Sequence, residues 1–150
     1  MNAEPGTVPF GVTFDAAGHL VVAEAGTEAL ATFDLLPDGT VTLLDAVPTG
    51  QMATCWIAQA DGYLYASNAG SGSESRYAEG PGGQLDLLGA TTTDPGTVDA
   101  AASPDGQFLY VQTGGTGIVD EFHVTAGGSL TEVGSVTVPG AVAGEGIVVS

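Results

Sequence analysis

Short apolar segments alternate with glycine-containing turns along the whole chain. A typical example is Ser103-Pro104-Asp105-Gly106, a tight turn followed by the aromatic and aliphatic run 108–111. Asp-Gly tolerates the positive φ that a short hairpin needs, and aromatic and aliphatic residues suit a pleated strand. No 11-residue window shows the period of an amphipathic helix. The pattern therefore predicts an all-β protein.

Glycines divide the chain at a constant spacing. Gly18, Gly62 and Gly106 lie 44 residues apart, and each precedes an apolar run. A second set keeps the same spacing: Gly39, Gly83 and Gly127. Four short strands fit into each 44-residue period, an arrangement typical of a β-propeller blade.

We therefore predict one domain over residues 1–150, a propeller arc of three four-stranded blades plus one closing inner strand. The blades are expected at about 8–50, 52–94 and 96–140, and the closing strand at 144–150. The expected strands are 10–14, 20–23, 29–33 and 41–44; 54–57, 64–67, 75–78 and 84–88; and 98–102, 108–112, 118–124 and 130–136. The core is expected to contain Trp56, Phe14, Leu20, Leu64, Tyr65, Leu109, Tyr110, Ile57 and Val111.

The charge is strongly negative. The chain has 18 Asp and Glu residues against one cation, Arg76, and a net charge of −17. Such a charge repels phosphate backbones and anionic lipid, so we expect no nucleic-acid or membrane partner. The first ten residues lack the basic and apolar regions of a signal peptide, which slightly favours a cytoplasmic location.

Four segments occur in a fixed order: Pro9-Phe10-Gly11-Val12-Thr13-Phe14-Asp15, Tyr65-Ala66-Ser67-Asn68-Ala69-Gly70, the turn and strand 103–111, and Gly144-Glu145-Gly146-Ile147. Together they resemble the lactonase family of seven-bladed β-propellers, which includes bacterial 6-phosphogluconolactonases. The similarity covers essentially the whole chain, which looks like the C-terminal half of a longer one. The resemblance implies hydrolysis of a sugar lactone in the central channel, without a metal or other cofactor.

Two carboxylates are candidates for the catalytic role. The first strand of each propeller blade lines the channel, which places Asp99 and Glu145 near its mouth. A partly desolvated carboxylate there could act as general base toward water attacking a lactone carbonyl, its pKa raised by burial or by a like-charged neighbour. The alternative is a carboxylate that accepts backbone N–H groups at the start of a strand.

Three further side chains are candidates for substrate binding. Glu24 and Asn68 end second strands on the same face and could orient substrate hydroxyl groups. Arg76 is the one side chain that could meet an anionic group, and we expect it in a mobile loop over 69–76.

Other chemistry is not favoured. His19 is expected in a solvated turn on the opposite face and His123 in a third strand, so they do not converge on a metal. Cys55 has no nearby cation in the sequence to lower its pKa, and Trp56 falls in an apolar column that predicts core packing.

Three functions remain open at this point. The first is a lactonase-type hydrolase, and the second is a propeller that only binds or supports other molecules. The third is a metal-dependent, gluconolactonase-like assembly of six blades from two copies. An arc of three blades would leave two apolar blade faces bare, so we expect either self-association or additional N-terminal blades.

Overall fold

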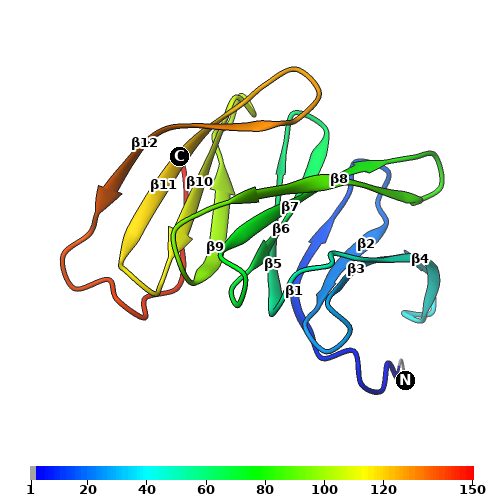
Figure 1. Ribbon diagram of the computed structural model, residues 1–150. Helices are drawn as coiled ribbons and strands as arrows, with labels where there is room; N and C mark the ends of the chain where they lie inside the picture. Colours follow the sequence, from blue (N-terminus) through cyan, green and yellow to red (C-terminus); the bar gives the residue numbers. More distant parts are fainter. Residues whose placement is uncertain (1–2) are drawn as a thin grey trace.

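The computed structural model describes residues 3–150 and is all-β (Figure 1). Three antiparallel sheets of four strands follow one another along the chain, each strand pairing with its neighbours in sequence. Blade 1 contains β1 (Pro9–Phe14), β2 (Leu20–Glu24), β3 (Ala29–Leu35) and β4 (Val41–Pro48). Blade 2 contains β5 (Thr54–Ala60), β6 (Tyr63–Asn68), β7 (Ser73–Glu79) and β8 (Leu85–Thr92). Blade 3 contains β9 (Thr97–Ala102), β10 (Phe108–Thr113), β11 (Ile118–Val124) and β12 (Leu130–Thr137).

The three blades lie side by side in chain order, from blue to orange in Figure 1. The first strands β1, β5 and β9 contact one another in succession, and the outer strands β4 and β8 also touch. This arrangement is a partial β-propeller and confirms the predicted fold. Within residues 3–150 there is no helix of the length and apolarity needed to cross a bilayer.

The pairing of third and fourth strands is interrupted at the same place in every blade. The register shifts between Thr32 and Phe33 in blade 1, between Arg76 and Tyr77 in blade 2, and between Glu121 and Phe122 in blade 3. A bulge increases local twist. The outer strand of each blade is therefore turned relative to the inner ones.

The core lies between the blades. One cluster joins blades 1 and 2, and another joins blades 2 and 3, so blade 2 is covered on both faces. The first cluster includes Val21, Leu30, Ile57, Leu64 and Tyr77; the second includes Tyr65, Leu109, Val111 and Phe122. Close approach of β1 to β5 depends on Gly11, where a Cβ would lie 2.7 Å from the carbonyl oxygen of Cys55.

Two predicted core residues are wrong. Phe14 is 54% exposed because it lies, with Phe10 and Val12, on the face of blade 1 that has no neighbouring blade in this chain. Trp56 is 36% exposed, and the ladder of β5 shifts register between Thr54 and Trp56, which breaks the alternation of inward and outward side chains.

Two segment predictions also need correction. Residues 144–150 form no strand, because a strand needs a ladder of backbone partners from a neighbouring strand. This segment is held instead by a bond from Gly144 N–H to the Ala141 carbonyl and by one from Ile147 N–H to the Asp99 carboxylate. The loop expected over 69–76 is shorter than predicted, since β7 begins at Ser73. Arg76 therefore lies within a strand.

Candidate functional site

The Asp99 carboxylate lies on β9, the innermost strand of blade 3, and is 5% exposed. Its Oδ1 accepts the N–H of Ala100 at 2.7 Å, and its Oδ2 accepts the N–H of Ile147 at 3.1 Å. Burial raises the pKa of Asp99 above its usual value, although these backbone bonds lower it in part. Asp99 is thus a buried carboxyl group that accepts backbone N–H groups, as the structural alternative considered from the sequence expects.

Glu145 lies near Asp99 and is exposed. Its negative charge is the smallest of the causes that shift the pKa of Asp99, and it raises that pKa. The 144–150 segment carries Glu145 there through the bond between Ile147 and Asp99. This pair is the candidate catalytic site on the channel side of the arc.

The predicted substrate-binding residues Glu24 and Asn68 are buried. Glu24 accepts a hydrogen bond from the Thr27 hydroxyl at 2.7 Å. Asn68 is fully buried: its Oδ1 accepts from the Thr54 hydroxyl at 2.8 Å, and its Nδ2 lies 3.0 Å from the Ser75 hydroxyl. Both hydrogen-bonding ends of Asn68 therefore serve the interior of blade 2.

Arg76 is placed away from Asp99, on β7. Its Nη1 donates to the Ser129 hydroxyl, and its Nη2 donates to the Leu88 carbonyl at 3.3 Å. The single cationic side chain of the protein thus links blade 2 to blade 3.

Glu74 is a buried carboxyl group that sequence reasoning missed. It is fully buried on β7, and the Ser67 hydroxyl donates to its Oε1 at 2.5 Å. Its Oε2 is buried and makes no hydrogen bond within the described chain. Burial raises the pKa of Glu74 to about 8; the Ser67 bond lowers it in part, and the charge of Asp99 raises it further. Only the pairing of β6 with β7 reveals this contact, because the polar run 71–75 resembles a loop in sequence.

Cys55 is a buried thiol. Its Sγ lies 3.6 Å from the Ser67 carbonyl and 3.7 Å from the Thr97 carbonyl. Burial raises its pKa to about 11, with smaller contributions from nearby carboxylates. A thiol in this state is a poor nucleophile at neutral pH.

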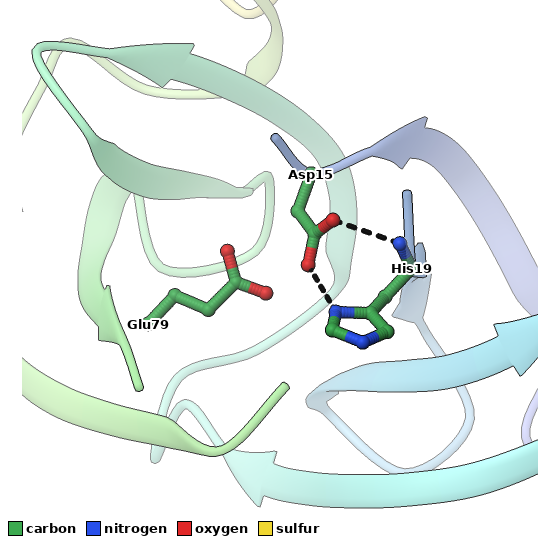
Figure 2. Close-up of side chains that lie close together, drawn as sticks. All are labelled: Asp15, His19 and Glu79. Carbon is green, nitrogen blue, oxygen red and sulfur yellow. Dashed lines mark hydrogen bonds and ion pairs between the residues drawn. The ribbon is translucent and has the colours of Figure 1, made fainter. Parts of the chain in front are cut away.

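A second group of titratable side chains lies at the turn between β1 and β2, shown in Figure 2. Asp15 Oδ1 accepts the backbone N–H of His19 at 2.8 Å, and Oδ2 lies 2.5 Å from the His19 ring Nδ1. Glu79, at the end of β7, points toward this pair from blade 2. His19 is therefore paired with Asp15 and is not the free, solvated turn residue that we expected.

The pKa values of the two carboxyl groups in this cluster are shifted in opposite directions. Burial would raise the pKa of Asp15, but hydrogen bonds with Glu79 and His19 outweigh it and lower the value to about 2. Burial and the neighbouring Asp15 raise the pKa of Glu79 to about 7. Asp15 is thus ionised and holds the His19 ring, while Glu79 holds a proton more readily than a solvated glutamate.

A cavity of about 360 Å³ adjoins this cluster. The turns between first and second strands of all three blades reach it. Its lining is Ala16, Gln59, Ala60, Asp61, Gly62, Tyr63, Leu64, Glu79, Ser103, Pro104, Asp105 and Gly106. The cavity lies on the opposite side of the arc from the start of β9, where Asp99 is found.

The β-propeller fold is shared with solved structures of several proteins. No protein-family model and no curated protein sequence matches the chain. Solved structures do: a proposed 6-phosphogluconolactonase from Bacteroides fragilis matches with a TM-score of 0.80 and 20% identity over 91% of this chain. The periplasmic gluconolactonase PpgL of Pseudomonas aeruginosa matches with a TM-score of 0.80 and 21% identity, also over 91%.

The same fold also occurs in a protein of different name. Hydrazine synthase of Kuenenia stuttgartiensis matches with a TM-score of 0.73 and 19% identity over 91% of this chain. The chain spans 41% of each of the two lactonase structures and 37% of the hydrazine synthase chain. At these identities the likeness establishes the fold and leaves the reaction to be argued from the residues.

Proposed function

We propose that these three blades form part of a lactonase-type propeller that hydrolyses sugar lactones, as the resemblance to 6-phosphogluconolactonases implies. In this proposal they correspond to the C-terminal half of a seven-bladed ring. The observation that carries it is the Asp99 carboxyl group, which is buried on the innermost strand of blade 3 beside the exposed Glu145. Structural similarity to two lactonases supports the choice of sugar lactones as the substrate class.

In the proposed reaction, Asp99 acts as general base. It takes a proton from water as the water oxygen adds to the lactone carbonyl carbon. The tetrahedral intermediate then collapses, the ring C–O bond breaks, and the proton passes to the departing ring oxygen to give the hydroxy acid. The raised pKa of Asp99 brings the carboxylate closer to the strength that proton transfer near neutral pH requires.

A second candidate is a propeller that binds ligands without catalysis. It is favoured by the positions of Asn68 and Arg76, whose polar groups are occupied by Thr54, Ser75, Ser129 and Leu88 within the protein. Arg76 is the only Lys or Arg residue of the chain. Because it is engaged in this way, no such side chain is free to meet a substrate phosphate. A neutral sugar lactone is therefore tested beside a phosphorylated one.

The test measures hydrolysis of gluconolactone and 6-phosphogluconolactone by the purified chain, against the spontaneous rate in buffer. Asp99→Asn keeps the shape and one acceptor oxygen, for the N–H of either Ala100 or Ile147, but removes the base. Asp86→Asn is the matched control, since Asp86 is an exposed carboxylate on β8. Catalysis lost in Asp99→Asn and kept in Asp86→Asn supports the hydrolase. Saturable lactone binding without turnover supports the second candidate.

A further inference from the structure

We propose that Asp15, His19 and Glu79 form a binding site for a divalent transition-metal cation, with Zn²⁺ as the ion that suits them best. One ligand atom from each residue lies within 4.8 Å of the others. One imidazole nitrogen and two carboxylate oxygens are ligands that Zn²⁺ accepts. The site is separate from Asp99 and does not depend on the proposed lactonase activity.

The three ligands come from two blades. Asp15 follows β1 and His19 precedes β2, so the β1–β2 turn of blade 1 presents both. Glu79 ends β7 of blade 2 and points at them across the boundary between the blades (Figure 2). An ion held by all three would therefore act as a structural clamp between blades 1 and 2.

No Lys or Arg side chain meets this cluster. The Oε1 atom of Glu79 is buried and makes no hydrogen bond within the described residues. A buried carboxylate oxygen without a partner is costly, more so beside a second carboxylate. The only Lys or Arg side chain, Arg76, donates to Ser129 and Leu88 instead. A cation would give the orphaned Glu79 oxygen a partner.

Small movements suffice to admit the ion. Zn²⁺ lies about 2.0–2.2 Å from nitrogen and oxygen ligands, which puts tetrahedral ligand atoms about 3.4 Å apart. Asp15 Oδ2 and His19 Nδ1 are now 2.5 Å apart, so they must separate by about 1 Å as the ion replaces the shared proton. Glu79 also lines the 360 Å³ cavity, which gives the ion a path of entry and room for water as a fourth ligand.

The experiment uses the untagged chain, stripped with a chelator and titrated with ZnCl₂ by calorimetry. We expect one equivalent bound and a higher melting temperature for the loaded protein. Glu79→Gln and His19→Asn should each weaken binding at least about tenfold. Glu4→Gln, which removes an exposed carboxylate, and His123→Asn, which removes the other histidine, should bind as the parent does.

A spectroscopic readout on the unmodified chain covers the case in which a variant fails to fold. Two-bond ¹H–¹⁵N spectra of the imidazole rings should show the His19 signals shifting at one equivalent of Zn²⁺, while those of His123 stay in place. Shifts of both rings together, no saturable binding, or equal affinity in Glu79→Gln and Glu4→Gln would each overturn the assignment.

Discussion

The hydroxyl group of Tyr65 donates a hydrogen bond of 2.7 Å to the backbone carbonyl of Gly128 and so joins blade 2 to the turn between β11 and β12 of blade 3. Tyr65 is fully buried, and its ring packs in the cluster shared by these blades. The bond therefore fixes the angle at which one blade meets the next.

Tyr65→Phe removes this bond but keeps the ring. The Gly128 carbonyl is then left buried without its partner, so we expect a loss of about 1–2 kcal/mol in unfolding free energy. Tyr63→Phe is the control, because the Tyr63 hydroxyl has no hydrogen-bond partner among residues 3–150, and the change should stay within about 0.5 kcal/mol. Urea denaturation measures both. Equal losses in the two variants would contradict this role of the Tyr65 bond.

Glu74 predicts a pH dependence of stability. Its pKa is raised from 4.5 to about 8 in the folded chain, which keeps a proton that the unfolded chain releases over this range. The stabilisation is complete below pH 4.5 and is lost as the pH rises through about 8.

Glu74→Gln keeps a neutral side chain at every pH, so its stability should decline less than that of the parent between about pH 5 and about pH 9. Glu4→Gln should keep the parental slope, because Glu4 is exposed. Thermal melts across the pH range give the comparison. Parallel curves for Glu74→Gln and the parent would show that Glu74 ionises normally.

Gly11 predicts a packing effect at the boundary of blades 1 and 2. In Gly11→Ala the new Cβ would lie 2.7 Å from the Cys55 carbonyl oxygen and 2.9 Å from the Trp56 Cα, both of them backbone atoms. We expect destabilisation by about 1–3 kcal/mol. Gly134→Ala is the control, since its Cβ would meet only the Glu121 carboxylate, at 3.9 Å. A similar loss in both variants would mean that β1 moves away freely.

The exposed apolar side chains of β1 predict self-association. Phe10, Val12 and Phe14 are 58%, 63% and 54% exposed and lie together on the open face of blade 1. Contiguous apolar surface of this kind favours a partner, and we propose a second copy of the chain.

Light scattering over a range of concentrations should show association of the parent and its loss in Val12→Asp. Val133→Asp, which adds the same charge at a 55% exposed position on β12, should associate like the parent. A parent chain that stays monomeric at all concentrations would contradict the proposal.

The fold could be predicted because its signals are local. Turn residues such as Asp105-Gly106 act within a few positions, and their 44-residue spacing defines three blades without knowledge of any long-range contact. The errors arise where a neighbour decides the outcome. Phe14 is an aromatic residue of the kind found in cores, but within residues 3–150 no blade covers it. The 144–150 segment likewise has no strand there with which to pair.

The candidate site was predictable only in part. Asp99 could be placed on an inner strand by alignment of the blades, and the structure puts it there with Glu145 nearby. Asp15 and His19 are four residues apart in one turn, so their contact had a sequence signal. Glu79 lies 60 residues further along the chain and joins them only through the packing of blade 2 on blade 1.

Blade 2 has a neighbour on each face, whereas blades 1 and 3 have one each. In a linear array of contacts, the units at the ends open first and at the lowest free energy. Backbone amides of β6 and β7 should therefore be the last to exchange with deuterium, and those of β1 among the first. The boundary that carries the Tyr65 bond and the boundary between blades 1 and 2 therefore set the order in which the blades unfold.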